Sequence, residues 1–423
     1  MAFSYIDIFA GAGGLSEGFQ RNGYIPVAHV EMKKEACFTL KTRECFYYLK
    51  KHGRIEDYKN YLRKEITRDE LYAMVPEEVL DSVINETMSE EGMPALFDRI
   101  DHLMEMQGIE NVDVLVGGPP CQAYSLVGRA RSKTNMVGDP RNYLYMLYCE
   151  VLEKYQPKLF VFENVPGLLS AMSDGTPIIQ LIESGFSSIG YEIVDDVKKY
   201  AKVDASDYGV PQNRERLIIL GIRKDLCEDV QVILHRFYLE ILPKYKSKKK
   251  KTVAEAIGDL PKITPIINDE ELKSRIGYSK PECHTTWHRA RHHSLRDVEI
   301  YRMLANDIQS GRNEYVDSKS LSDLYEEKVG AKSPIHRYHV LRADEPSTTI
   351  ISHLDRDGNR FIHYDPEQGR DITPREAARI QSFDDDFDFI GNQTDTYIMI
   401  GNAVPPLLAK CVGLAVSEVL DIL

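Results

Sequence analysis

The sequence lacks three features that would place the protein outside the cytosol. No apolar run approaches the length needed to cross a membrane, about 20 residues. The seven cysteines are an odd number and no two form a C-x-x-C pair, which argues against a disulfide framework and a cysteine-rich zinc site. A predicted strand begins at Phe3, which leaves no room for a signal or transit peptide. We therefore expect a cytoplasmic protein without membrane contact.

The chain also lacks an excess of positive charge. Its 53 Lys and Arg residues stand against 66 Asp and Glu, a net charge of −13, which taken alone disfavours a nucleic acid partner. The distribution is uneven, however: residues 41–113 carry 10 basic and 17 acidic side chains, whereas residues 198–262 carry 15 and 9. A basic region can hold a phosphate backbone, although a solvated loop explains its four consecutive lysines, residues 248–251, equally well.

The first 31 residues have the pattern of a nucleotide-cofactor site. A predicted strand leads into a turn containing Gly11, Gly13 and Gly14, and a predicted helix follows. Glycines at such a turn let the backbone approach a ligand. The pyrophosphate fingerprint G-x-G-x-x-G is not met, because Ser16 occupies its last position. The second strand ends on Glu31, where a carboxylate can accept both ribose hydroxyls. Together these features favour an adenosine-type cofactor without a pyrophosphate over a purely structural turn.

Three later strands are each joined to a reactive or polar side chain. The apolar run from Val112 breaks at Gly-Gly-Pro-Pro and delivers Cys121, a second run ends in Glu163, and Arg214 and Arg216 share one face of a segment that enters a third. Ligands bind beyond the carboxyl ends of parallel strands. A thiolate there can add to an electron-poor ring while a carboxyl with a raised pKa supplies a proton. Each of these features also has a purely structural explanation. Cys121 can be a buried apolar residue, Glu163 a capping residue, and the two arginines the solvated edge of a strand.

The remaining stretches carry less chemistry. Residues 37–108 are acidic and have a helical period, and we interpret them as helices that cover the sheet, enlarged by an insertion. Residues 123–142 contain glycines and cations that suit a mobile loop closing over an anionic substrate. Further on, the strand–helix alternation stops. The i, i+4 spacing of His284, His288 and His292 next to Cys283 invites a zinc hypothesis, but phosphate contacts or ordinary surface histidines explain it more simply.

Six motifs occur in an order that resembles the motif set of the DNA (cytosine-5) methyltransferases. They occupy residues 7–15, 118–122, 163–165, 212–216, 379–383 and 401–406. Each motif alone is weak evidence, but six in order along almost the whole chain are specific. The resemblance implies an α/β fold, with a Rossmann-like, mostly parallel sheet that binds S-adenosylmethionine and a smaller target-recognition domain.

The resemblance also implies domain boundaries. Residues 1–250 would form the first part of the catalytic, cofactor-binding domain, with a helical insertion at about 37–108. Residues 251–370 would form the target-recognition domain. Residues 371–423 would return to the catalytic domain beside its first strand.

The same resemblance implies a role for each motif residue. Cys121 would add to C6 of a cytosine flipped out of the duplex, Glu163 would bind and protonate N3, and Arg214, with Arg216 nearby, would contact the base O2. Methyl transfer to C5, loss of the C5 proton and release of Cys121 would then leave 5-methylcytosine. The cofactor pocket would be lined by Phe9, Gly11, Gly13, Gly14, Glu31, Met32, Pro120 and Asn402.

The expected partners follow from the same family. Double-stranded DNA is the expected substrate, a cognate restriction endonuclease is a further partner to consider, and a monomer is expected because no apolar stripe suggests a dimer. The rivals are a tRNA cytosine-5 methyltransferase and a catalytically silent DNA-binding regulator. A recognition region of about 140 residues favours DNA, since it can enter the major groove. One family feature has no clean match: Asp98 and Asp101 are the candidates for the acidic contact to the adenine amine.

Overall fold

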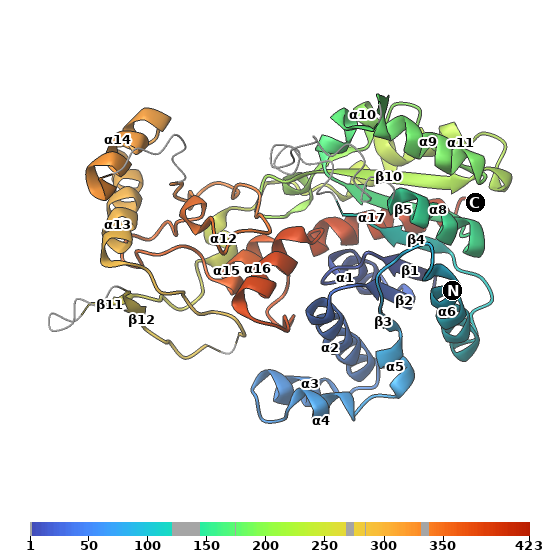
Figure 1. The fold of residues 1–423 in the computed structure, drawn as a ribbon, viewed down its shortest axis with the longest axis horizontal. Helices are drawn as coiled ribbons and strands as arrows, with labels where there is room; N and C mark the ends of the chain where they lie inside the picture. Colours follow the sequence, from blue (N-terminus) through green and yellow to red (C-terminus); the bar gives the residue numbers. More distant parts are fainter. Residues whose placement is uncertain (1, 121–143, 174, 268–274, 284, 331–337) are drawn as a thin grey trace.

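The computed structural model describes residues 2–120, 144–173, 175–267, 275–283, 285–330 and 338–423. Cys121, the loop expected at residues 123–142 and His284 therefore lie outside the described residues. The described chain forms a larger unit built on a sheet and a smaller unit rich in loops (Figure 1).

The larger unit is organised around one eight-stranded, mostly parallel sheet in the order β3-β2-β1-β4-β5-β10-β8, with β9 paired to β10. The first five strands of that order run parallel, whereas β10 is antiparallel to both of its neighbours. This confirms the Rossmann-like fold class. The strands are β1 Ser4–Ile8, β2 Ile25–Glu31, β3 Val83–Asn85, β4 Val114–Gly117, β5 Leu159–Asn164, β8 Tyr191–Ile193, β9 Lys202–Asp204 and β10 Glu215–Arg223.

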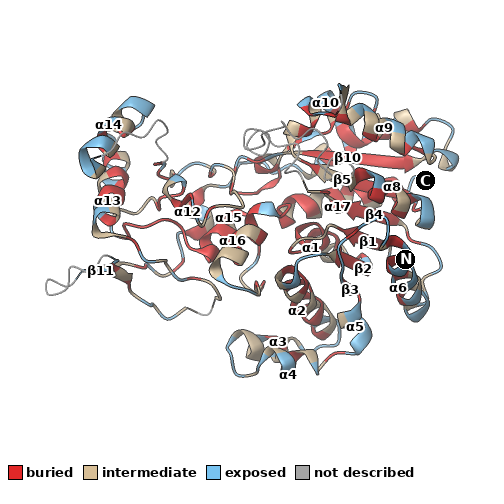
Figure 2. Cartoon of the chain, in the orientation of Figure 1, coloured by how far each residue is buried: buried red, intermediate tan, exposed pale blue. Residues whose placement is uncertain are grey.

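The central strands are buried because helices cover both faces of the sheet. Every residue of β1 and β4 is buried (Figure 2), as expected for near-continuous apolar runs in a parallel sheet. The covering helices are α1 Gly14–Arg21, α6 Met93–Gln107, α8 Leu144–Tyr155, α9 Ile178–Ser188, α11 Val230–Arg236 and α17 Pro406–Leu420. A single core cluster extends from Tyr5 to Leu242 and continues from Val404 to Leu420.

The C-terminal helix α17 lies against α1, and glycines make this close approach possible. A Cβ added at Gly18 would lie 2.4 Å from the carbonyl carbon and the Cβ of Ala409, and one at Gly14 would lie 2.1 Å from the Val404 oxygen. The Tyr24 hydroxyl donates to the Gly413 carbonyl at 2.9 Å across the same contact. The C-terminal segment thus returns beside the first strand and its helix.

The stretch Gln393–Leu420 is apolar and long enough by composition to cross a membrane, although two thirds of its most apolar part is buried inside the fold. The expectation that no apolar stretch reaches this length was therefore wrong. The structure divides the stretch into two helices, α16 Gln393–Asn402 and α17, which are separated at Ala403. Its apolar side chains fill the interior of the fold, and this packing accounts for the composition.

Residues 37–108 are helical, as predicted, and also contain the short strand β3. Helix α2 Lys34–Lys51 leads into α3 Ile55–Leu62, α4 Arg68–Tyr72 and α5 Glu77–Asp81. These helices share a small core of their own, made of Cys45, Phe46, Leu49, Tyr58, Leu71 and Val75. They also hold the loop after α15 (Pro374–Ile380): the Tyr58 hydroxyl donates to the Asp386 carbonyl at 2.9 Å and that of Tyr61 to the Asp388 carboxylate at 2.7 Å.

The smaller unit has little regular structure and several small cores. Its elements are α12 Val253–Ile257, β11 Pro265–Ile266, β12 Gly277–Tyr278, α13 Leu295–Gln309, α14 Ser318–Val329, α15 Pro374–Ile380 and α16. Helices α12, α15 and α16 share one core cluster, so residues 374–402 pack with the smaller unit rather than with the sheet.

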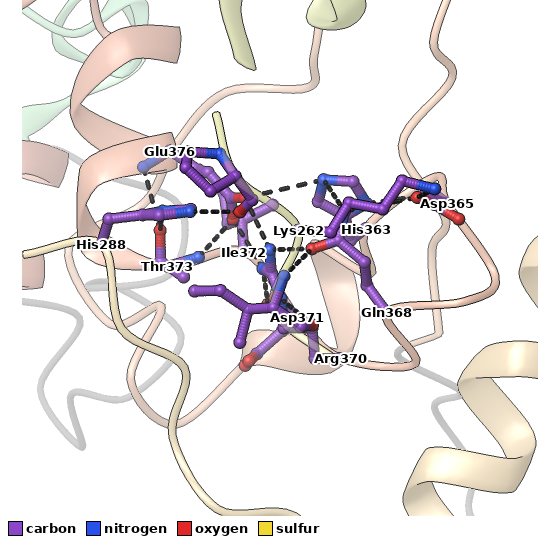
Figure 3. A network of polar contacts seen from close by, with 12 residues as sticks. Lys262, His288, His363, Asp365, Gln368, Arg370, Asp371, Ile372, Thr373 and Glu376 are labelled. Carbon is purple, nitrogen blue, oxygen red and sulfur yellow. Dashed lines mark hydrogen bonds and ion pairs between the residues drawn. The ribbon is translucent and has the colours of Figure 1, made fainter. Parts of the chain in front are cut away.

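A buried polar network joins α15 to the loops of the smaller unit (Figure 3). Arg370 forms a bidentate ion pair with Glu376 in which both distances are 2.7 Å. Burial opposes the charge on Glu376, but the Arg370 guanidinium outweighs it and lowers the pKa of this carboxyl to about 2. Burial lowers the pKa of His363 to about 4, so its 3.6 Å approach to Glu376 is a contact of a neutral ring and not an ion pair at neutral pH.

Two crossings of the chain between the larger and the smaller unit lie side by side. The Val253 N–H donates to the Glu345 carbonyl at 2.9 Å, and that of Ala254 donates to the Ala343 carbonyl at 2.9 Å. The returning strand-like segment then pairs with the motif before β10, where the Asn213 N–H donates to the Ser347 carbonyl at 2.8 Å. The two crossings therefore form a narrow, hydrogen-bonded neck.

Candidate active site

The predicted site residues gather at the carboxyl edge of the sheet. Gly11 and Gly13 follow β1, Glu31 ends β2, Pro120 follows β4 and Glu163 lies near the end of β5. Because these four strands are adjacent and parallel, their carboxyl ends form one continuous edge.

The turn after β1 is fixed by its own backbone conformation and by Glu31. Phe9, Gly11 and Gly13 have φ angles of +57°, +56° and +82°, the left-handed region that glycine adopts at little cost. The Gly11 N–H donates to Oε2 of Glu31 at 2.8 Å, and the Lys33 N–H donates to Oε1 at 2.8 Å. The carboxylate is thereby held against the glycine turn, where the sequence predicted a ribose contact.

Strand β3 supplies a residue that the sequence did not reveal. Asn85 ends this strand, and its Nδ2 donates to the Glu31 carbonyl at 3.0 Å and to the Met32 carbonyl at 2.9 Å. The acidic candidates lie elsewhere: Asp98 is exposed on α6, and Asp101 pairs with Lys154 of α8 at 2.8 Å. The structure thus places an amide, and neither candidate acid, beside Glu31. A three-residue strand is too short to leave a periodic signal.

The approach to Cys121 is held by β1 and by β5. A Cβ at Gly117 would lie 2.4 Å from the Ile8 carbonyl oxygen, and one at Gly118 would lie 2.7 Å from Oε2 of Glu163. The Asn164 side chain donates to the Pro119 carbonyl at 3.2 Å. Close packing against the backbone therefore requires Gly117, whereas a side chain at Gly118 would displace the Glu163 carboxylate. The backbone is held beside Glu163 up to two residues before the cysteine.

Glu163 and Arg216 form a nearly buried pair. Arg216 Nε lies 3.0 Å from Oε1 of Glu163, and the two side chains are 12% and 13% exposed. Burial raises the pKa of the Glu163 carboxyl, and the positive charges of Arg216 and Arg214 moderate this rise. The site thus contains a carboxyl that retains a proton to higher pH than an ordinary glutamate, with an arginine beside it.

Arg214 has a different environment from the one the sequence suggested. Its side chain is fully buried, and its Nη1 donates to the Ile350 carbonyl at 2.7 Å while Nη2 donates to the carbonyls of Gly401 and Ala403 at 2.8 and 3.0 Å. The expected contact of Arg214 with the base does not fit this geometry, since both terminal nitrogens bond the backbone. Arg216 is the arginine that reaches Glu163.

Three motifs meet around Arg214. Gln212 accepts the Ile350 N–H at 3.0 Å and donates to the Ile380 carbonyl at 3.1 Å. Gln381 lies beside it and donates to the Ile400 and Ala403 carbonyls at 2.8 and 2.9 Å. The motifs before β10, in α15 and after α16 are therefore bonded into one buried joint between the two units.

The other predicted cofactor residues lie on accessible surface. Met32 is 57% exposed, Asn402 is exposed, and Phe9 and Pro120 are half-buried. Gly14 is buried in the contact with Val404. This contact within the protein explains why a glycine stands here, without any contact to a ligand. The remaining residues are at least partly accessible to solvent at the strand ends.

The described residues contain no group of three or more His, Cys, Asp or Glu side chains that could hold a metal ion. Both ring nitrogens of His288 already contact protein, Nδ1 the Thr373 hydroxyl at 3.2 Å and Nε2 the Pro261 carbonyl at 2.8 Å. His292 contacts the Ile276 carbonyl through Nδ1 at 3.2 Å. These histidines serve the packing of the smaller unit.

The lysine run is partly neutralised by neighbouring carboxylates. Lys249 lies 2.6 Å from Glu255, and Lys250 lies 3.6 Å from Asp204. Of the two interpretations left open by the sequence, a phosphate-binding region and a solvated loop, these ion pairs favour the solvated loop.

Comparison with known proteins identifies the family. A family model described as C-5 cytosine-specific DNA methylase matches residues 3–76 and 96–418. The type II methyltransferase M.Bpa9945I of Bacillus paralicheniformis is 33% identical and covers 98% of this chain and 99% of its own length. M1.HphI of Haemophilus parahaemolyticus, also a type II methyltransferase, is 30% identical over 99% of this chain and 87% of its own.

Solved structures share the fold at low identity. A prophage-encoded E. coli protein described as a DNA modification methyltransferase superimposes with a TM-score of 0.56 at 22% identity, covering 99% of this chain and 100% of its own. The Dnmt2 methyltransferase of S. pombe gives a TM-score of 0.50 at 13% identity, with 99% of both chains covered. The chain therefore belongs to the C-5 cytosine-specific DNA methylase family and is a DNA (cytosine-5-)-methyltransferase with S-adenosylmethionine as its methyl donor.

Proposed function

We propose that this protein methylates C5 of one cytosine within a specific short duplex sequence, through a covalent bond between Cys121 and C6 of a flipped base. The observation that supports this mechanism best is the pair Glu163–Arg216. It lies against Gly118, three residues before Cys121, and it combines a carboxyl whose pKa is raised with a fixed positive charge. A base delivered to this edge meets a proton donor and a nucleophile together.

The residues present fit S-adenosylmethionine, which supplies the methyl group when bound. Each oxygen of Glu31 accepts one backbone N–H, and a carboxylate has about four acceptor positions, so acceptors remain for the two ribose hydroxyls. The glycine turn after β1 allows close approach of the backbone. Phe9, Met32, Asn85, Pro120 and Asn402 would complete the pocket, with Asn85 near the adenine end in place of an acid.

The chemistry assigned to the side chains balances in protons and electrons. The Cys121 thiolate bonds to C6 while Glu163 gives a proton to N3, which moves the electron pair to C5. C5 takes the methyl group and then loses its proton to a base. As C5 and C6 regain their double bond, Cys121 leaves and Glu163 recovers the N3 proton. Arg216 is assigned the contact to the base O2 that the family resemblance implied for Arg214, and Arg214 is assigned the buried joint.

Duplex DNA is the proposed substrate, since the most similar relatives named above are type II methyltransferases. A cognate restriction endonuclease, a monomeric state and a cytoplasmic location complete the proposal. We divide the chain into a catalytic domain at residues 1–250, a recognition domain at 251–370 and a C-terminal segment. The packing of α15 and α16 with the smaller unit supports a return to the catalytic domain at Val404 rather than at residue 371.

The test is incorporation of tritiated methyl from S-adenosylmethionine into duplex DNA and, separately, into bulk tRNA, followed by bisulfite sequencing of the labelled DNA. We expect label at one cytosine within a short sequence, and none with Cys121→Ala, which should still bind the duplex. Label in tRNA alone would overturn the substrate. Unchanged turnover by Cys121→Ala would overturn the covalent mechanism.

A further inference from the structure

A chain of polar side chains is buried between the sheet and helices α1 and α2. It runs from Asp7 on β1 through Ser16 on α1 and His29 on β2 to Glu44 on α2. All four residues are at most 6% exposed. The chemistry proposed above uses none of them, and because charged groups are costly to bury, their presence here needs an explanation of its own.

The contacts of this polar chain fix the protonation of His29. The Ser16 hydroxyl donates to Oδ2 of Asp7 and lies 3.0 Å from Nδ1 of His29. Because a hydroxyl has one proton to donate, Ser16 must accept from a protonated Nδ1. The other ring nitrogen, Nε2, lies 3.1 Å from Oε1 of Glu44 and needs its own proton to face a carboxylate. Burial alone would lower the pKa of His29, but Glu44 outweighs it and raises this pKa. His29 is thus an imidazolium between two carboxylates.

Asp7 is the least satisfied member of the polar chain. Its Oδ2 accepts from Ser16, but its Oδ1 has no hydrogen-bond partner among the described residues. Buried polar atoms normally have such a partner, so the charge of this carboxylate is only partly compensated inside the protein. Burial raises the pKa of Asp7 to about 6, although the positive charge of His29 opposes the rise. Asp7 is therefore ionised at neutral pH and uncharged in mild acid.

Asp7 lies directly behind the glycine turn. Phe9 follows two residues later, at most about 7 Å along the chain, and the first glycine of the turn is Gly11. In the register of β1 and β2, Asp7 pairs with His29, which lies two residues before Glu31. Besides burial, the negative charge of Glu31 raises the pKa of Asp7. The two carboxylates therefore sense each other, and a charge placed at the turn acts on Asp7 in the same way.

The other charged and titratable groups around the polar chain do not cancel its charge. Burial raises the pKa of the Tyr5 and Tyr148 phenols well above their usual value, so both stay neutral. Glu17 pairs with Arg43 at 2.7 Å and with Arg21 at 2.9 Å. The polar chain itself holds two carboxylates against one imidazolium. Its net charge at neutral pH is therefore negative.

We infer that Asp7, kept ionised by Ser16 and His29, makes the glycine turn selective for charge, so that it favours the cationic S-adenosylmethionine over S-adenosylhomocysteine, the product whose sulfur is uncharged. The inference rests on the placement of the cofactor at this turn in the proposed function. The two ligands share their adenine, ribose and amino acid ends, so contacts to these ends cancel in the ratio of the two Kd values. Two unit charges about 10 Å apart, at an effective dielectric constant of about 20, change an affinity by about tenfold. Such a preference weakens the retention of the product after each methyl transfer.

The test measures the Kd of both ligands by calorimetry on the full-length protein without DNA, over a pH series from about 5 to about 8. Asp7 gains a proton as the pH falls through its pKa of about 6. We therefore expect the ratio of the product Kd to the cofactor Kd to be about tenfold larger at neutral pH than in acid. Asp7→Asn should hold this ratio at its acid value throughout. The control Asp81→Asn removes the same charge from an exposed position before β3 and should leave the profile unchanged.

A second measurement keeps the inference testable if Asp7→Asn does not fold. In nitrogen NMR spectra of the wild-type protein with isotope-labelled histidine, the signal that His29→Gln lacks should show both ring nitrogens protonated at about pH 7.5, where a free histidine is neutral. A Kd ratio that does not change with pH, or a neutral His29 at this pH, would overturn the inference. Neither readout uses methyl transfer to DNA, so both stay interpretable if the proposed function fails.

Discussion

At the scale of single residues, Arg214 and Arg216 belong to one motif but lie in different environments. They are two positions apart, yet Arg216 reaches the Glu163 carboxylate whereas Arg214 is buried among backbone carbonyls. The alternation of a strand-like segment would place both on one face. The structure shows that the same face meets two environments, the site edge at one end and the domain joint at the other.

Replacement of Glu163 by Gln should remove the proton donor without changing the shape of the site. We expect turnover to fall between about 100-fold and 10,000-fold. Because the pKa of Glu163 is raised, the wild-type kcat/KM should fall as the pH rises through the ionisation of Glu163, at a higher pH than for an ordinary carboxyl. The variant should lose this falling limb. A pH series of methyl transfer measures this, with Glu215→Gln, an exposed neighbour, as the control.

Lysine substitutions separate the roles of the arginines. Arg214→Lys retains the charge but leaves buried carbonyls without donors, at a cost of about 1–3 kcal/mol for each group, so the midpoint of urea unfolding should fall clearly. Arg216→Lys keeps a positive charge beside Glu163 and leaves no buried carbonyl without its donor, so it should lower stability less than Arg214→Lys does, and it should lower kcat. Equal losses of stability in the two variants would contradict this division.

At the scale of elements, the glycines of α1 are explained by α17 and not by the cofactor. Gly18 lies outside the glycine turn, and the atoms it approaches belong to the backbone of a helix almost 400 residues later in the sequence. The sequence gives no sign of this contact, because a glycine inside a helical pattern has the same appearance whatever packs against it.

Gly18→Ala should therefore destabilise the protein by about 1–3 kcal/mol, as overpacking does, while the Kd for S-adenosylmethionine changes little. Gly185→Ala in α9 is the matched control, since its added Cβ would find neighbours no nearer than 3.4 Å, and helix propensity favours alanine. Urea unfolding of both variants checks this. A Gly18→Ala protein as stable as the wild type would disprove the close contact of α1 with α17.

The sequence predicted the elements whose signal is local and strong. The parallel strands, the glycine turn and Glu31 follow from apolar runs that end at Gly or a charged residue, and the motif order identified the family. Asn85 was missed because three residues of strand leave no period. The task of Arg214 was misassigned because its acceptors, at Ile350 and Gly401, lie more than 130 residues away and no local pattern reports them.

At the scale of the whole molecule, stability depends on polar joints between units as well as on the sheet. The network around Arg370 and Glu376 connects α15 to the loops of the smaller unit, and His363 is neutral within it at neutral pH. An unfolded histidine titrates near 6.5, so the unfolded chain binds a proton at a pH where the folded chain does not.

Acid should therefore open this joint. The contribution of His363 is fully present above about pH 6.5 and is lost as the pH falls towards 4, in total about 3 kcal/mol for a shift of this size. His363→Gln should flatten the loss of unfolding free energy between pH 6.5 and 4, as measured by urea unfolding at a series of pH values. The exposed His52→Gln should leave the pH profile as in the wild type.

The neck at Val253 and Glu345, where the chain crosses between the two units, has a consequence for the segment that it encloses. Val253 and Glu345 are hydrogen-bonded neighbours, so everything between them is an excursion whose two ends start and finish at one point. No strand of the eight-stranded sheet lies in this segment, so its length and loops can change without altering the strand order. Under the proposed function, target choice would then diverge in this segment while the proposed chemistry at Glu163 and Cys121 stays the same.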